Sequence, residues 1–141
     1  MLKGIDSRLS PDLLYLLAQM GHGDRLAIVD RNYPAESSDV PVVRMDAVDL
    51  VTALDAVLTV FPVDTFVEQP LGGMNQVDDP EAVPEVQREA FELVNRMEER
   101  EVGVERIERF AFYEAVRGCY AVVATGEDRP YGCIILTKGV L

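Results

Sequence analysis

Histidine and cysteine are scarce in this 141-residue sequence, which contains one histidine, His22, and two cysteines, Cys119 and Cys133. A lone histidine excludes a metal site built from several histidines of one chain. Two cysteines make neither a disulfide framework nor a zinc cluster. We therefore expect no metal site, and we interpret both cysteines as reduced thiols on or beside strands.

Basic residues are also few: 13 Lys and Arg stand against 25 Asp and Glu, which gives a formal net charge of −12. Binding to nucleic acid or to an anionic membrane surface requires clustered Lys and Arg. No apolar run reaches the length of a signal peptide or a membrane span. We therefore expect a cytoplasmic protein that binds neither nucleic acid nor membranes, whereas a neutral substrate such as a free sugar is compatible with this charge.

Motifs of nucleotide-binding proteins and hydrolases are missing as well. The glycines of the run LGGM, residues 71–74, lack both the GxGxxG spacing and the Lys-Ser/Thr of a phosphate-binding loop. No GxSxG nucleophile motif occurs, and nothing places either cysteine next to the single histidine as a protease would require.

The composition is that of one packed domain. Apolar residues make up 48% of the chain, and a chain of this length suits a single core, so we expect one domain over residues 1–141. Ser10 as a cap and Pro11 at the first helical position begin a helix that Gly21 ends. Asp46, with Asp49 as part of a weak capping box, begins a second helix. We expect the second helix to end at Pro62, a third to run from Pro84 to Gly103, and a fourth from Arg109 to Arg117.

Short apolar runs between these helices predict strands. Leu26–Val29 is typical of a buried strand, and we expect residues 31–45 to form a loop with a brief strand at Val42 and Val43. Strands are also expected over residues 63–68, 119–124 and 133–137, the last two forming a hairpin, and a loop over residues 69–75. Because strands and helices alternate, the sequence predicts an α/β layered domain with a central sheet flanked by helices.

His22 is the most suggestive candidate for a functional residue. It lies between Gly21 and Gly23 just after a helix, where neighbours without side chains let a substrate approach closely. An imidazole donates and accepts protons near neutral pH, since its ordinary pKa is about 6.5. The alternative is an exposed loop histidine without a role.

Three further positions combine polar chemistry with a favourable place. Asp30 follows a buried strand, and ligands of α/β sheets bind beyond the carboxyl ends of strands, although an Asp there also forms turns. Arg109 beside Phe110 could donate to a substrate hydroxyl or be a surface residue at a helix start. The pair Tyr131-Gly132 could contact a ligand or belong to an ordinary turn.

Taken together, these segments resemble the L-fucose mutarotase and D-ribose pyranase (RbsD/FucU) family. The order is GHGD, a strand ending in Asp30, YPAESS, RFAFYE, and YG followed by an apolar strand and Lys138-Gly139. The similarity extends from LKGIDSRLSPDLL to LTKGVL, nearly the whole chain. VDRNYPAESS and RFAFYE resemble the fucose mutarotase branch more than the ribose branch.

The resemblance implies an RbsD-like fold and a cofactor-free isomerase that interconverts ring forms of a free sugar. It makes His22 the proton donor, Asp30 and Arg109 substrate contacts, and Tyr131-Gly132-Cys133 the counterpart of a Tyr-Gly-Asn segment. Cys133 departs from that pattern, because a thiol is a poor substitute for an amide as a hydrogen-bonding group.

The resemblance further implies a homo-oligomeric ring, often a decamer, with the active site at a subunit interface. A mutarotase acting on L-fucose or a related sugar is the expected function. The alternatives are a D-ribose pyranase, a non-catalytic sugar-binding accessory of a transport system, and an oligomer that binds no sugar.

Overall fold

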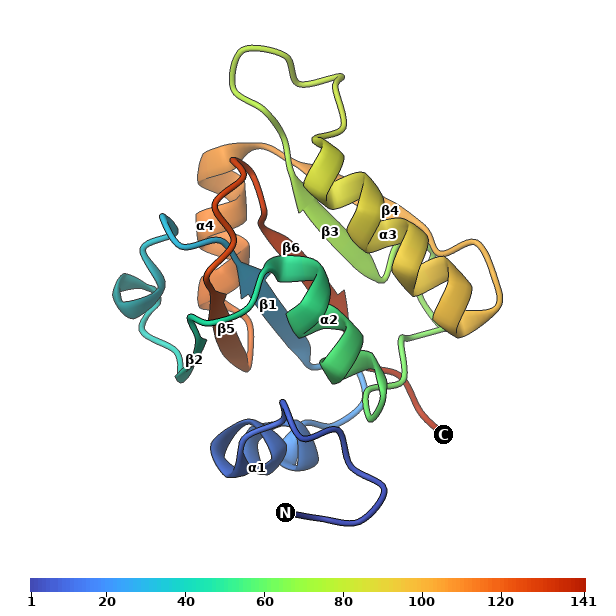
Figure 1. Cartoon of the computed structure of the whole chain (residues 1–141). Helices are drawn as coiled ribbons and strands as arrows, with labels where there is room; N and C mark the ends of the chain where they lie inside the picture. The colour runs from blue at the N-terminus through green and yellow to red at the C-terminus, as the bar shows by residue number, and fades with distance from the viewer.

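A computed structural model describes all 141 residues and contains one six-stranded mixed sheet with helices on both faces (Figure 1). The strand order is β2-β5-β1-β6-β3-β4. The predicted α/β class with a central sheet is therefore confirmed. The strands are β1 (Arg25–Val29), β2 (Val42–Met45), β3 (Leu71–Met74), β4 (Val104–Ile107), β5 (Ala121–Thr125) and β6 (Ile134–Thr137).

The alternation of side chains along each strand divides the core into two clusters, one on each face of the sheet. On β1, Leu26 and Ile28 pack with α1 (Pro11–Gln19), α2 (Leu50–Leu58) and α3 (Glu85–Glu98). The neighbouring Ala27 and Val29 pack with α4 (Arg109–Arg117) and the 3₁₀ helix η1 (Ala35–Ser38) on the opposite face. No helix is long and apolar enough to cross a membrane.

Several predicted helix ends are confirmed, and others shift for local reasons. The Ser10 side chain accepts a hydrogen bond from the N–H of Leu13 and begins α1 as expected. Helix α2 begins after Asp49 rather than at Asp46, because the Asp49 carboxylate caps the N–H of Thr52.

Helix α3 ends well before Gly103, where the sequence predicted its end. Glu99 adopts a left-handed conformation at φ 55° and terminates the helix. Gly103 has another reason to be glycine, since a Cβ there would lie 2.1 Å from the backbone oxygen of Glu68.

The strand predictions around the third helix were wrong in two places. Residues 63–68 contribute only an isolated bridge between Val63 and Lys138, whereas the expected loop at 69–75 contains the buried strand β3. Two glycines lower the strand propensity of this segment, so propensity alone does not predict it. A Cβ on Gly72 would lie 2.9 Å from Ile107 Cδ1, so the packing of β3 against β4 requires a residue without a side chain. Strand β4 itself was not predicted from the sequence.

The predicted hairpin between β5 and β6 was also wrong, because β1 lies between them. Strand β1 pairs in parallel with β5 and antiparallel with β6. The register sets Arg25 opposite Thr137 and Ile28 opposite Ile134. The start of β6 therefore lies beside the end of β1, which brings Cys133 next to Asp30.

Candidate active site

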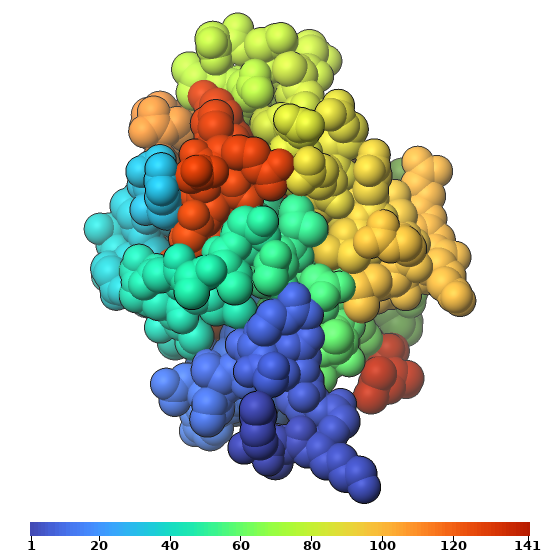
Figure 2. All heavy atoms as spheres, in the orientation of Figure 1, coloured from blue at the N-terminus to red at the C-terminus, as the bar shows by residue number.

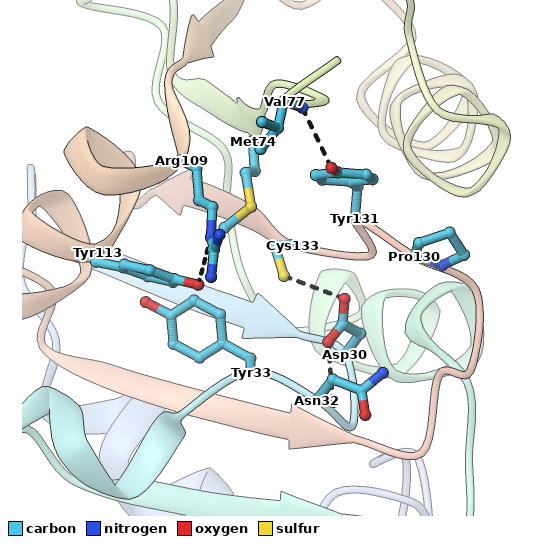
Figure 3. A pocket seen from close by; sticks show the side chains of 10 residues that line it. All are labelled: Asp30, Asn32, Tyr33, Met74, Val77, Arg109, Tyr113, Pro130, Tyr131 and Cys133. Atoms are coloured by element: carbon cyan, nitrogen blue, oxygen red, sulfur yellow. Dashed lines mark hydrogen bonds between the residues drawn. The ribbon is translucent and has the colours of Figure 1, made fainter. Parts of the chain in front are cut away.

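A cavity of about 290 Å³ lies at the sheet edge where β1 and β3 end and β6 begins (Figure 3). Segments far apart in the sequence supply its walls: the residues after β1, the end of β3, the start of α4 and the segment before β6. Its lining combines carboxylate, guanidinium, amide, hydroxyl and thiol groups with aromatic faces. The lining residues are Asp30, Asn32, Tyr33, Met74, Val77, Arg109, Tyr113, Pro130, Tyr131 and Cys133.

Asp30 is the carboxylate of this cavity, and its side chain is fixed by two neighbours. One oxygen accepts from the N–H of Asn32 at 3.0 Å, and the other accepts from Cys133 Sγ at 3.4 Å. Burial, reinforced by the Asp30 charge, raises the pKa of the Cys133 thiol well above its usual range. Cys133 is therefore a neutral, weak donor that faces the carboxylate.

Arg109 occupies the first position of α4, where Glu108 caps the helix by accepting from the N–H groups of Phe110 and Ala111. Its Nε donates to the Tyr113 hydroxyl at 3.0 Å, one helical turn further on. The guanidinium also lies over the rings of both Phe110 and Tyr113, 5.3 and 5.5 Å from the ring centroids. The cation is thus held at the cavity wall with donors to spare.

Tyr33 and Tyr113 form an aromatic corner of the cavity, with ring centroids 5.4 Å apart. Burial raises the pKa of the Tyr33 hydroxyl above its ordinary value, so this phenol stays protonated. Aromatic faces next to hydroxyl groups suit a ligand that presents both C–H and O–H groups.

Tyr131 enters the cavity from the segment between β5 and β6. Its backbone is in the left-handed region at φ 61°, which is uncommon for a side-chain-bearing residue. Its hydroxyl accepts from the N–H of Val77 at 3.2 Å. Gly132 is not part of the cavity lining. A Cβ there would lie 2.8 Å from Glu127 Cγ and 3.3 Å from Asp30 Cβ, so this glycine lets two acidic side chains pack against the backbone.

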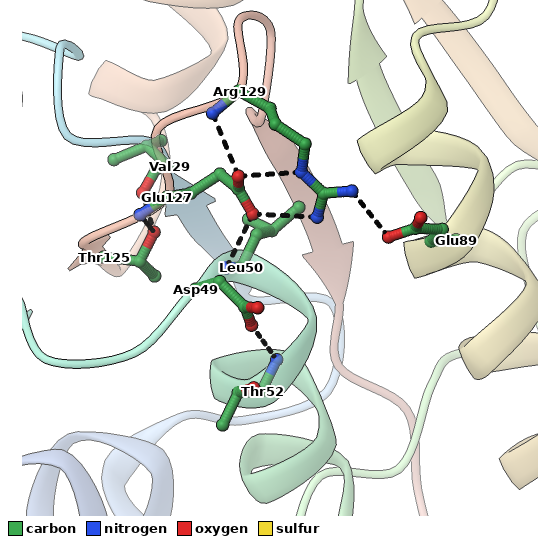
Figure 4. Close-up of polar contacts among 8 residues, drawn as sticks. All are labelled: Val29, Asp49, Leu50, Thr52, Glu89, Thr125, Glu127 and Arg129. Carbon is green, nitrogen blue, oxygen red and sulfur yellow. Dashed lines mark hydrogen bonds and ion pairs between the residues drawn. The ribbon is translucent and has the colours of Figure 1, made fainter.

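An ion network behind the cavity anchors the segment that carries Tyr131 (Figure 4). The Glu127 carboxylate is buried and accepts from the N–H of Leu50 and from the backbone N–H, Nε and Nη2 of Arg129. Arg129 Nη1 donates to Glu89 of α3 at 2.8 Å. Figure 2 shows the segment (orange-red) at the surface between α2 (green), α3 (yellow) and the loop after β3 (lime green).

His22 lies at the opposite end of β1 from the cavity. Gly23 donates its N–H to the carbonyl of Lys138, just after β6 ends, which ties the histidine loop to that edge. The rise of about 3.3 Å per residue along β1 separates His22 from Asp30 by roughly 20 Å. A single chain thus brings together Asp30, Arg109, Tyr131 and Cys133 but does not bring His22 to them.

His22 nevertheless lies in a defined polar environment. Its Nε2 is hydrogen-bonded to Asp64 Oδ1 at 2.9 Å, and its ring contacts Phe66 at a centroid distance of 4.8 Å. Burial alone would raise the pKa of Asp64, but hydrogen bonds from His22 and from the N–H groups of Phe66 and Val67 hold that pKa below its usual range. Asp64 is therefore a buried carboxylate that holds one ring nitrogen of a 42% exposed imidazole side chain.

Sequence reasoning missed several of these residues. Asn32 and Tyr33 directly follow Asp30, and Tyr113 lies four residues after Arg109 on the same helix face, so the spacing offered a usable signal. Asp64 gave no signal, because 42 residues separate it from His22. No group of three or more His, Cys, Asp or Glu side chains is arranged to hold a metal ion.

A small cavity with one carboxylate, one guanidinium and several phenols, at the edge of an α/β sheet, has the donors, acceptors and aromatic faces that suit a small polyhydroxylated molecule. Residues 3–141 match the model of the RbsD / FucU transport protein family, so the chain belongs to this family. This confirms the resemblance drawn from the sequence.

Individual relatives agree with this assignment. The L-fucose mutarotase of Actinobacillus pleuropneumoniae serotype 5b is 42% identical over 140 residues, covering 99% of this chain and 97% of the relative. The fucose mutarotase of Streptococcus pneumoniae, solved in complex with L-fucose, has a TM-score of 0.92 at 36% identity and 99% coverage of both chains. Bacillus subtilis RbsD, solved with D-ribose, shares the fold with a TM-score of 0.75 at 21% identity, covering 100% of this chain and 99% of RbsD.

Proposed function

We propose that this protein is a cofactor-free mutarotase that interconverts the anomers of free L-fucose or a closely related sugar. The observation that carries the proposal is the 42% identity over 99% of the chain to a relative named L-fucose mutarotase. The cavity supports it independently, because its mixture of donors, acceptors and aromatic faces suits a monosaccharide.

Mutarotation requires proton transfer at two oxygens. A base takes the proton of the anomeric hydroxyl while an acid protonates the ring oxygen, so that the bond between C1 and the ring oxygen breaks and a carbonyl forms at C1. Rotation about the C1–C2 bond and the reverse proton transfers close the ring on either face. Acid–base help of this kind accelerates a reaction by about 10²–10⁴-fold.

We assign these roles to residues as follows. His22 is the acid–base group, since one ring nitrogen is held by Asp64 and the other makes no hydrogen bond within the chain. Asp30 accepts from sugar hydroxyls, Arg109 donates to one, and Tyr131 binds the sugar or relays a proton. Cys133 completes the wall beside Asp30, where the weak thiol donor leaves most of the carboxylate's capacity to the sugar. Gly132 does not line the cavity and contributes by leaving room for the Asp30 side chain.

We further propose that His22 reaches the cavity from a neighbouring subunit. Exposed apolar side chains flank both regions: Phe66 and Val67 beside His22, and Val77 and Phe110 beside the cavity. Two different surfaces that cover each other make a head-to-tail contact, which closes into a ring when the rotation permits. A ring of subunits, with a decamer as the expected size, would thus complete the site. The expected location of the protein remains the cytoplasm.

The first test measures sugar anomer exchange by saturation-transfer NMR, with L-fucose and D-ribose in parallel. Wild type should accelerate L-fucose exchange, and His22→Ala should lose at least about a hundredfold of that acceleration while keeping its fold and assembly. Acceleration of D-ribose alone would favour a pyranase. Saturable binding without exchange would favour a sugar-binding accessory, and full activity of His22→Ala would remove His22 from the mechanism.

A mixing experiment tests the shared site. His22→Ala subunits keep an intact cavity, and Tyr131→Phe subunits keep His22, so co-assembled subunits contain some complete sites. Exchange should therefore rise above the level of either weakened variant when the two are unfolded and refolded together. Tyr120→Phe, which removes a hydroxyl bonded to Gln19 far from the cavity, is the matched control and should remain active. Absence of recovery in verified mixed assemblies would contradict a site shared between subunits.

A further inference from the structure

The side chain of Gln87, on the first turn of α3, is fully buried behind the cavity and makes three hydrogen bonds. Its Nε2 donates to the backbone carbonyls of Met74 and Tyr131, both at 2.8 Å. Its Oε1 accepts from Arg106 Nη1 at 2.7 Å. The amide orientation follows from its partners, because carbonyls only accept and a guanidinium only donates.

Arg106 of β4 fixes this amide. Burial lowers the pKa of its guanidinium, and no carboxylate lies within ion-pair distance of it, so Gln87 is its principal partner. Gly73 provides the space for this hydrogen bond. A Cβ at Gly73 would lie 2.5 Å from Gln87 Oε1 and 3.1 Å from Arg106 Nη1. The hydrogen bond between Arg106 and Gln87 therefore requires a glycine at the second position of the pair in LGGM.

The two carbonyls that Gln87 holds belong to residues that line the cavity. Met74 ends β3, and its N–H donates to the carbonyl of Cys133 at 3.2 Å, where the backbone contacts between β3 and the β6 segment stop. The Gln87 amide extends the link from Met74 to Tyr131, two residues further from β6. The left-handed backbone of Tyr131 is a conformation that a side-chain-bearing residue adopts only when its surroundings hold it there. The hydrogen bond to its carbonyl is the direct restraint on that peptide.

We propose that Gln87, held by Arg106, is a positioning residue that aims the Tyr131 phenol into the cavity. Gln87 does not line the cavity and acts only through the peptide it restrains. The inference extends the proposed function, in which Tyr131 contacts the sugar. It predicts that sugar turnover is sensitive to the two N–H donors of Gln87 even though they face away from the ligand.

Two substitutions remove these donors in different ways. Gln87→Glu keeps the size and the acceptor for Arg106 but faces both carbonyls with an oxygen, and Gln87→Met keeps the length without polar atoms. Gln69→Glu is the matched control, because the Gln69 amide donates to the Val104 carbonyl at an exposed position away from the cavity. The thermal transition of each variant is measured alongside its activity.

A double-mutant cycle with Tyr131→Phe separates positioning from general support of the fold. In the wild-type background, Gln87→Glu and Gln87→Met should each lower kcat/KM for anomer exchange about tenfold. In the Tyr131→Phe background, the same substitutions should cost less than about twofold. Equal losses in both backgrounds would overturn the proposal, since Gln87 would then act by another route.

A second readout does not depend on which sugar is turned over. The chain has five tyrosines, so fluorotyrosine labelling gives a resolvable ¹⁹F spectrum in which Tyr131→Phe identifies one resonance. Both Gln87 variants should split or broaden that resonance, while Tyr33 and Tyr113 and the whole Gln69→Glu spectrum stay unchanged. A sharp, unsplit Tyr131 resonance in both variants would overturn the proposal. Absence of exchange by wild type together with a split resonance would refute the proposed function and leave the positioning role supported.

Discussion

Replacing Glu127 with Gln tests how the segment that carries Tyr131 is anchored. The Glu127 carboxylate is 2% exposed and accepts four hydrogen bonds, one from Leu50 at the start of α2 and three from Arg129. An amide of the same size keeps one oxygen but turns an NH₂ group toward donors. Glu127→Gln therefore leaves buried donors without an acceptor and removes the charge that partners Arg129.

The cost follows from these contacts. Unsatisfied buried polar groups cost about 1–3 kcal/mol, and breaking one side of a buried ion pair costs about 3–5 kcal/mol. Arg129 is 35% exposed and keeps Glu89 as a partner, which moderates the loss, so we expect about 3 kcal/mol. An unfolding entropy of about 2.1 cal/mol/K per residue then converts this into a Tm lower by about 10 °C.

The pH dependence has a definite sign. Burial alone would raise the pKa of Glu127, but the hydrogen bonds from Arg129 and Leu50 hold it below its usual range. A carboxyl whose folded pKa is lowered stabilises the protein fully above its unfolded pKa of about 4.3, and that stabilisation disappears as the pH falls through the folded pKa. The Tm difference between wild type and Glu127→Gln should therefore be largest near neutral pH and narrow in acid.

Thermal unfolding followed by circular dichroism measures this difference, at one protomer concentration because assembly also affects Tm. Glu36→Gln is the matched control. Its carboxylate, 75% exposed, lies 3.7 Å from Arg44, and its loss should leave Tm unchanged. A Glu127→Gln Tm within about 2 °C of wild type, or a gap that widens in acid, would refute the account of this network.

Three further outcomes follow from particular residues. Burial raises the pKa of Cys119 to about 11 and that of Cys133 well above its usual range. Iodoacetamide at pH 8 should therefore modify neither thiol in the folded protein and both thiols in denaturant, and mass spectrometry counts the modified cysteines. Glu99→Gly relieves a left-handed residue and should raise Tm by about 2–4 °C, whereas Glu92→Gly within α3 should lower it. Asp64→Asn should lower Tm by a few degrees at pH 7 and by less in acid, since the stabilisation by a carboxyl of lowered pKa is lost as the pH falls; a loss independent of pH would contradict this.

Local sequence signals predicted those parts of the fold whose causes are local. Ser10 and Pro11 mark the start of α1 because capping depends on neighbouring residues. The apolar run Leu26–Val29 predicted β1 because a strand covered on both faces must be apolar throughout. Asp30 directly follows that strand, and ligands of α/β sheets bind beyond the carboxyl ends of strands, so its place in a cavity could be expected from the sequence.

Other parts depended on partners far along the chain. Strand β3 contains two glycines because a Cβ at either position would collide with a neighbour, Ile107 at the first and the Gln87 amide at the second. The left-handed end of α3 at Glu99 arises without glycine. The β3 glycines have no local signal, because their deciding contacts join residues that are distant in sequence. The helix end has none because Glu99 is not the glycine that ordinarily marks a left-handed helix end.

The sequence by itself determined the family, the α/β class and a set of candidate polar residues. These are His22, Asp30, Arg109, Tyr131 and Cys133. Only the tertiary structure decided how they are grouped. Because β6 runs antiparallel to β1, Cys133 meets Asp30 at one end of the sheet, while His22 meets Asp64 at the other. Strand order and direction come from the packing of the whole core, and no short segment of sequence contains that information.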